Sequence, residues 1–138
     1  MSILEKQYKI INEFSLFEDW NDTYEYIIAA GRCLKEYPDS HKTDNHLIRG
    51  CQSKVWLRAE FVDGIMLYGG DSDTAIIKGI IAILLEVFSG NLPEDIISAD
   101  TNFIKEIGLK DFLAPTRANG LVAMINQIKS YALEQSSN

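Results

Sequence analysis

The stretch from Ala75 to Phe88 constrains the fold most strongly, because it is apolar on nearly every side. Lys78 and Glu86 interrupt it, and it is shorter than the ~20 residues that a transmembrane helix needs. A helix that is hydrophobic all round is buried in the centre of a protein. The sequence therefore predicts a central core helix here, ended by the Ser-Gly-Asn sequence at 89–91. The rest of the chain must cover this helix.

A β-hairpin pattern precedes the core helix. Apolar and polar side chains alternate over residues 54–62, Asp63-Gly64 favours a two-residue turn, and residues 65–70 return as a second strand. This turn predicts two cross-strand pairs, Phe61 with Met66 and Ala59 with Tyr68. Two strands alone are marginally stable, so we expect a third strand around Leu47–Arg49 and helices over the apolar face.

Helical spacing of apolar residues predicts further helices over 2–14, 17–34, 92–112 (in one or two short pieces) and from Pro115 onward, with Thr116 as cap. The first has an apolar face of Leu4, Tyr8, Ile11 and Phe14. The second has an inner side of Trp20, Tyr24, Ile27, Ile28 and Gly31. Before the core helix, Asp71, Ser72 and Asp73 are all good N-caps. With 138 residues and no linker or repeat, we expect one domain over residues 1–138.

The net charge of −7 excludes some classes of partner. Nucleic acids and anionic membrane surfaces bind basic faces, which this composition does not favour. A protein partner with a basic patch is still compatible with this charge, since an acidic surface would steer the association of the two proteins. The amino terminus has no signal-peptide pattern, so we expect a cytoplasmic protein. In that compartment Cys33 and Cys51 are expected to stay reduced.

Cys51 is the residue with the most suggestive surroundings. Gly50 allows a sharp turn just before it, and Arg49 and Lys54 are cations that favour the reactive thiolate. The alternative is that Cys51 is a small buried hydrophobic residue, as many free cysteines are. Cys33, in the last turn of a predicted helix, is interpreted as a packing or half-exposed thiol with no role. The spacing of the cysteines with His41 and His46 does not fit a metal site.

Three stretches together resemble the SufE/CsdE family of cysteine-desulfuration proteins. They are Gly50-Cys51-Gln52-Ser53-Lys54-Val55-Trp56, the segment from Gly70 to Gly79 that begins Gly-Asp-Ser-Asp, and Leu113-Ala114-Pro115-Thr116-Arg117-Ala118-Asn119-Gly120-Leu121. The resemblance covers essentially the whole chain. It implies an α+β fold in which a small antiparallel sheet packs on helices, similar to the IscU-type iron–sulfur scaffolds.

The resemblance also implies a function. The chain would accept persulfide sulfur on Cys51 from a cysteine desulfurase of the SufS/CsdA type and pass it to an iron–sulfur scaffold. Arg117 matches the family's supporting arginine, and Asp71 and Asp73 form a plausible docking corner. Only the desulfurase would carry a cofactor, pyridoxal phosphate. His46 stands where the family often has asparagine, and it either orients the turn or biases protonation of the thiol.

Two other classes of function remain open. An independent cysteine hydrolase or transferase would need a base held against the thiol, and His46 is close in sequence. An interaction domain would use neither cysteine. The oligomeric state, including a homodimer, is not decided by the sequence.

Overall fold

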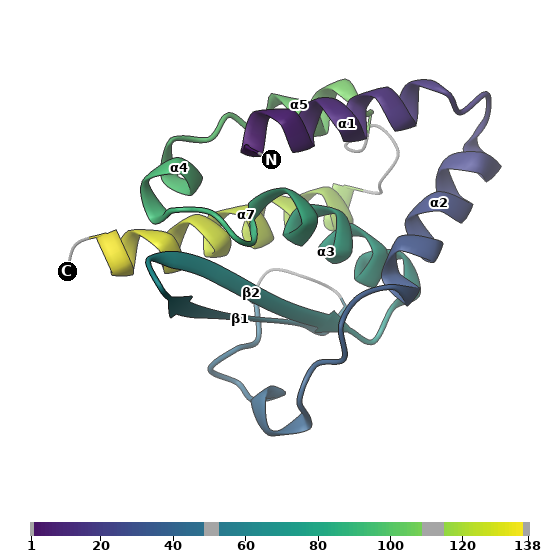
Figure 1. Ribbon diagram of the computed structural model, residues 1–138. Coiled ribbons are helices and arrows are strands. Elements are labelled where there is room, and N and C mark those ends of the chain that lie inside the picture. The colour runs from purple at the N-terminus through teal and green to yellow at the C-terminus, as the bar shows by residue number, and fades with distance from the viewer. Residues whose placement is uncertain (1, 49–52, 109–114, 137–138) are drawn as a thin grey trace.

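The computed structural model describes residues 2–48, 53–108 and 115–136, without the side chains of residues 115–118. The elements form layers (Figure 1). Helices α3 (Ala75–Phe88) and α7 (Pro115–Ser136) are central, strands β1 (Val55–Val62) and β2 (Ile65–Ser72) lie on one side, and helices α1 (Ile3–Ser15) and α5 (Asn102–Glu106) on the other. Helix α2 (Trp20–Arg32) packs along α3, and α4 (Pro93–Ser98) along α7. The predicted α+β fold is confirmed.

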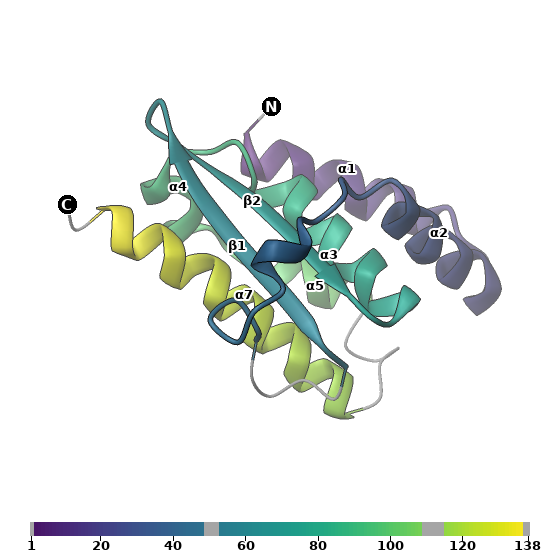
Figure 2. The ribbon, with the colours of Figure 1, turned by 90° about the horizontal axis from the view of Figure 1, so that it is seen from below.

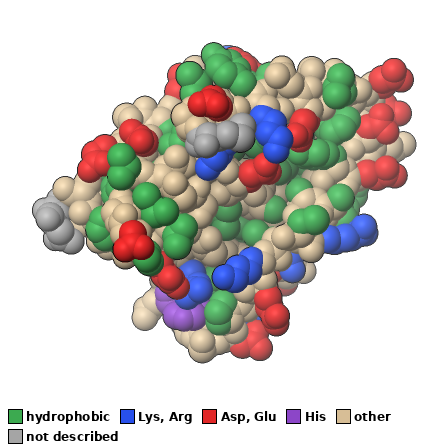
Figure 3. Space-filling model, in the orientation of Figure 1, with side chains coloured by type: hydrophobic (Ala, Val, Ile, Leu, Met, Phe, Trp, Pro, Cys, Tyr) green, Lys and Arg blue, Asp and Glu red, His purple; other side chains and the backbone are tan. Residues whose placement is uncertain are grey.

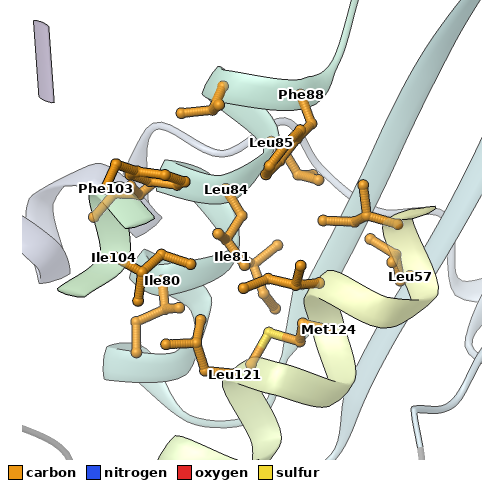
Figure 4. Close-up of a cluster of buried hydrophobic side chains, with 14 of the residues drawn as sticks. Leu57, Ile80, Ile81, Leu84, Leu85, Phe88, Phe103, Ile104, Leu121 and Met124 are labelled. Carbon is orange, nitrogen blue, oxygen red and sulfur yellow. The ribbon is translucent and has the colours of Figure 1, made fainter. Parts of the chain in front are cut away.

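Helix α3 is the centre of the core, as its sequence predicts. Ten of its fourteen residues are buried. Figure 4 shows its side chains between α5 (Phe103, Ile104) and α7 (Leu121, Met124), with Leu57 of β1 on a further side. The helix ends where predicted, because Gly90 takes a φ of +83°, a value that residues with a Cβ atom rarely adopt.

The hairpin has the predicted register. Ala59 pairs with Tyr68 and Phe61 with Met66. Asp63 and Gly64 both have positive φ angles, 52° and 85°, as a type I′ turn requires. Val55 and Leu57 are buried, but Phe61 near the turn is exposed. Near the turn, Met66 of β2 is buried in the core, whereas its partner Phe61 is not.

The predicted third strand around Leu47–Arg49 is wrong over the part that the structure describes. Leu47 forms a single bridge with Trp56 there, and Arg49 lies outside the described residues. The ladder would continue with a hydrogen bond from the His46 N–H to the Leu57 carbonyl. This bond is missing because both groups bond elsewhere. The His46 N–H donates to the Thr43 carbonyl, and the Leu57 carbonyl accepts the Tyr131 hydroxyl of α7. A tight turn and a packed helix thus replace the strand.

The predicted apolar faces of α1 and α2 are only partly right. Four residues of the predicted inner faces are exposed to solvent, namely Leu4, Tyr8, Trp20 and Tyr24. In α1 the buried face is Ile3, Gln7, Ile10 and Phe14, rotated by one position from the prediction. Gln7 is buried because its side-chain amide donates to the Asp100 carbonyl at 2.7 Å. A polar residue that satisfies its hydrogen bond can lie in a core, which an apolar pattern does not reveal.

The predicted helix starts also need correction. Helix α2 begins at Trp20 rather than Phe17, because the Asp19 side chain caps it by accepting from the Asp22 N–H. Helix α7 begins at Pro115, so residue 116 lies inside the helix and is not its cap. Between α2 and β1, a short 3₁₀ helix, η1 (Asp39–His41), lies across the outer face of the hairpin (Figures 1 and 2).

Helices α2 and α3 approach each other closely at two glycines. A Cβ atom added to Gly79 would lie 2.0 Å from the Ile27 carbonyl oxygen, and one added to Gly31 would lie 2.8 Å from the Gly79 nitrogen. Both contacts are with backbone, which cannot move as a flexible side chain does. Two glycines facing each other therefore allow the helices to pack at this distance. In the part of the chain that the structure describes, no helix is long and apolar enough to cross a membrane.

We predict that Gly79→Ala lowers the free energy of unfolding by about 1–3 kcal/mol or more, because overpacking forces the helices apart. Gly69→Ala is the control, because its Cβ would meet the flexible Arg58 side chain at 3.3 Å. It should change stability by no more than about 1 kcal/mol. Urea unfolding measures both. Equal stability of the two variants would contradict the close α2–α3 contact.

Candidate functional site

Two of the predicted site residues are not described in full. Cys51 lies in the segment 49–52, outside the described residues, and Arg117 is placed only as part of the backbone of α7. Their proximity therefore stays a prediction. The chain on either side of the segment is described, and it shows how the fold holds the region. We call residues 46–48 the upstream arm and residues 53–54 the downstream arm.

The upstream arm is fixed along the outer edge of β1. The Leu57 N–H donates to the His46 carbonyl at 2.9 Å, and the Ile48 N–H donates to the Val55 carbonyl at 2.8 Å. Ile48 is buried in the core. Two backbone hydrogen bonds and an apolar anchor therefore hold the chain up to residue 48.

The downstream arm is fixed by the residues that follow β2. The Lys54 N–H donates to the Asp73 carboxylate at 3.1 Å, and the Ser72 hydroxyl donates to the Lys54 carbonyl at 2.7 Å. The hydroxyl oxygens of Thr74 and Ser53 are 2.7 Å apart. The predicted capping role of Asp73 is therefore wrong. The N-cap of α3 is Thr74, without a side-chain capping bond, and the Asp73 carboxylate bonds across to the downstream arm.

Both arms meet at one end of the hairpin. Val55 is paired with Ser72 at the end opposite the Asp63-Gly64 turn. The segment 49–52 is thus connected to two anchored ends beside the start of α3.

Asp71 has a different environment from Asp73. Its carboxylate lies 3.3 Å from the Lys42 ammonium and 3.5 Å from that of Lys78, and the side chain is only 14% exposed. It also accepts from the Ser72 N–H. Asp71 therefore ties the segment after η1 to β2 and α3, with its charge neutralised inside the chain. Asp73 belongs to the exposed surface, so of the two it is the more accessible to a partner.

His46 lies in the turn that leads into the upstream arm. Its Nδ1 is 3.0 Å from the Thr43 hydroxyl, and its ring meets the His41 ring edge-on, with 5.2 Å between centroids. Partial burial, with the nearby His41 and Arg58, lowers the pKa of His46. His46 is therefore neutral at neutral pH. Neither sequence spacing nor helix pattern revealed that the two histidines touch.

Comparison with known proteins assigns the chain to a family. The model of the SufE "Fe-S metabolism associated domain" matches residues 8–132. An uncharacterized SufE-like protein of Rhizobium meliloti (strain 1021) is 37% identical over 129 residues, which cover 90% of this chain and 92% of that protein. The chain belongs to the SufE family. The resemblance seen in the three motifs is confirmed.

The fold of this SufE-family protein agrees with a solved structure. The solution structure of a hypothetical protein from Thermus thermophilus matches with a TM-score of 0.81 over 96% of this chain and 97% of that chain. The two sequences are 18% identical, so this likeness shows the fold alone.

The other cysteine of the SufE-family chain is in a different environment. Cys33 is exposed at the C-cap of α2 and lines a cavity of about 540 Å³ between α2 and α3. The residues around it include Ala30 and Leu34. Cys33 is therefore not a buried packing thiol, because its side chain is exposed at the end of the helix. Among the described residues, no three His, Cys, Asp or Glu side chains gather in a way that could hold a metal ion.

We predict that the Thr74–Ser53 contact stabilises the fold by about 0.5–1.5 kcal/mol, as a typical internal hydrogen bond does. A double-mutant cycle with Thr74→Val and Ser53→Ala, followed by urea unfolding, measures this coupling. The control cycle pairs Thr74→Val with Ser98→Ala, whose hydroxyl donates to the Glu94 carbonyl within α4. That coupling should be close to zero. Equal couplings in the two cycles would show that the hydroxyl pair does not anchor the downstream arm.

Proposed function

We propose that this protein is a sulfur acceptor and carrier. Cys51 takes the persulfide sulfur of a cysteine desulfurase of the SufS/CsdA type, and the protein passes that sulfur to an iron–sulfur cluster scaffold. In doing so it relieves the desulfurase of its product and stimulates its turnover. The protein is not an independent catalyst in this proposal.

Family membership is the observation that carries the proposal. The SufE match spans residues 8–132 and so includes Cys51, the cysteine in the family's Gly-Cys-Gln-Ser motif. The two arms on either side of segment 49–52 add support, because each is held to the fold by hydrogen bonds. Cys33 has no such motif around it.

The proposed chemistry is thiol–persulfide exchange. The Cys51 thiolate attacks the outer sulfur of the donor's cysteine persulfide, a new S–S bond forms, and the donor's own S–S bond breaks. The donor cysteine leaves as a thiolate, and Cys51 becomes a persulfide. No external oxidant or reductant is needed, because one S–S bond replaces another. The proton lost by the Cys51 thiol is balanced by protonation of the departing thiolate.

The partner supplies the remaining chemistry. The desulfurase carries pyridoxal phosphate and releases sulfur from cysteine, so this chain needs no cofactor of its own. A persulfide carrier works where thiols stay reduced, which places its proposed role in the cytoplasm.

An independent cysteine hydrolase is less well supported. Such an enzyme needs a base that a third group orients, often a carboxylate. His46 is held by the Thr43 hydroxyl and the His41 ring. In the described part of the chain, no carboxylate bonds to its imidazole. The sulfur-carrier role is therefore the function that the observations favour.

Cys51→Ser and Cys33→Ser separate the two cysteines. A serine hydroxyl cannot accept a persulfide sulfur, because its alkoxide is scarcely populated at neutral pH. We predict that folded Cys51→Ser protein fails to stimulate desulfurase turnover, while Cys33→Ser stimulates it as the unaltered protein does. Sulfide release with cysteine as substrate is the assay, with folding checked by circular dichroism. Full stimulation by Cys51→Ser, or none by folded Cys33→Ser, would overturn the assignment.

Arg117 is proposed to support the transfer. Arg117→Lys keeps the positive charge but loses the planar guanidinium that makes two parallel hydrogen bonds. We predict slower transfer of sulfur to Cys51 with unchanged desulfurase binding, measured by single-turnover persulfide formation and by titration. Lys129→Arg is the control on the same helix, because its ammonium donates to carbonyls at the end of α4. If sulfur transfer is as fast in Arg117→Lys as in the control, the planar guanidinium of Arg117 is not needed.

Asp73 is proposed to contact the desulfurase. Asp73→Asn removes the negative charge but keeps a carbonyl oxygen that can accept from the Lys54 N–H, so the downstream arm should survive. If the charge docks the partner, the dissociation constant of the complex rises and rises less at high salt. Glu25→Gln, an exposed acid on α2, is the control. Unchanged binding by Asp73→Asn would remove this carboxylate from the interface.

A further inference from the structure

The two histidines form one surface cluster. His41 ends η1, and His46 lies in the turn that follows it, with the rings 5.2 Å apart. The histidine side chains of Figure 3 lie together at the surface, beside a basic side chain. Solvent protons can therefore reach the cluster without any opening of the fold.

His46 holds the upstream arm through three contacts. Its N–H donates to the Thr43 carbonyl at 3.0 Å, its carbonyl accepts from the Leu57 N–H at 2.9 Å, and its ring is 3.0 Å from the Thr43 hydroxyl. The ring contact closes the turn that aims the carbonyl at β1. The position of the ring and the attachment of the arm are thus coupled within one residue.

The charged groups around this cluster have both signs. Asp44, in the turn between the two histidines, is exposed to solvent. The Arg58 guanidinium lies over the Tyr37 ring at 6.0 Å and pairs with Glu60, and Lys42 pairs with Asp39 and Asp71. Each of these three paired carboxylates already has a cation. Tyr37 donates to the His41 carbonyl, and burial raises its pKa to about 12, so it stays neutral.

A proton on His46 would therefore meet two positive neighbours, His41 and Arg58. The Thr43 hydroxyl can donate to a neutral ring or accept from a protonated one, so this bond favours neither protonation state of His46. Partial burial of the ring, and after it repulsion from His41 and Arg58, disfavour the protonated form. Moving the ring toward water relieves both effects and opens the turn.

We propose that His46 is a positioning residue, which in its neutral form holds the upstream arm on β1 and releases it when its own ring takes up a proton. The link to Cys51 rests on the proposed function, but the release itself does not. Of the two roles that the sequence left open for His46, this one is the orienting role.

The direction of the pH effect follows from the lowered pKa of His46. A histidine that binds its proton more weakly in the folded state contributes its full stability above its unfolded pKa, about 6.5. That contribution is lost as the pH falls from there through the folded pKa. The upstream arm is therefore held at neutral pH and is loosened under mildly acidic conditions.

Amide hydrogen exchange of the free protein, followed by NMR, tests the proposal without a desulfurase. The Leu57 and Ile48 amides hold the arm, and the Met66 amide, which donates to the Asn91 carbonyl, reports on the far end of the hairpin. After correction for intrinsic rates, protection of Leu57 and Ile48 should fall severalfold between about pH 7.5 and about pH 5.5. Protection of Met66 should stay constant.

Two variants make the test specific. His46→Asn has no proton to take up, so protection of Leu57 and Ile48 should not depend on pH. His41→Asn removes a charge that opposes protonation of His46, so the fall should remain but move to higher pH. No fall in the unaltered protein, the same fall in His46→Asn, or no shift in His41→Asn would overturn the proposal. Failure of the desulfurase assays would instead overturn the proposed function and leave this result standing.

Discussion

The burial of α3 governs the arrangement of the other elements. The helix is apolar on nearly every side, so water must be excluded from all of its faces at once. Helix α2 covers one face through the contact of Gly31 with Gly79, and β2, α1 and α7 cover others. Because α3 follows β2 after only two residues, the end of the hairpin is fixed beside its first turn.

That junction places the candidate site. Residues 72–74 leave the hairpin and enter α3, and on the way they bond to Ser53 and Lys54. On the other side, the bridge at Leu47 attaches residues 46–48 to β1. The segment that carries Cys51 is therefore joined to the core through both of its neighbours. In the sulfur-carrier role that we propose, the reactive residue would have to meet two different proteins, and arms held to the core would suit that role.

Local patterns predicted the elements whose cause is local. The Asp63-Gly64 turn fixed the hairpin register, and the apolar run fixed α3 and its end. Long-range competition explains what the sequence did not reveal. Nothing in the sequence near Leu57 indicates that the Tyr131 hydroxyl donates to its carbonyl, so the sequence predicts a longer third strand than the structure has. Likewise, Gln7 is buried only because Asp100 lies across from it. The candidate site divides in the same way: resemblance identified the motif around Cys51, whereas the bonds of Asp73 to the downstream arm and the contact of His41 with His46 depend on the fold.

The central claim is that Cys51 carries the sulfur, and the most direct test is mass spectrometry of the protein itself. The chain is incubated briefly with a cysteine desulfurase and cysteine, free thiols are blocked, and the peptides are analysed without a reducing agent. The account predicts one extra sulfur on the peptide that contains Cys51 and none on the peptide that contains Cys33. Extra sulfur on Cys33 alone, or on neither peptide while the desulfurase is active, would contradict it.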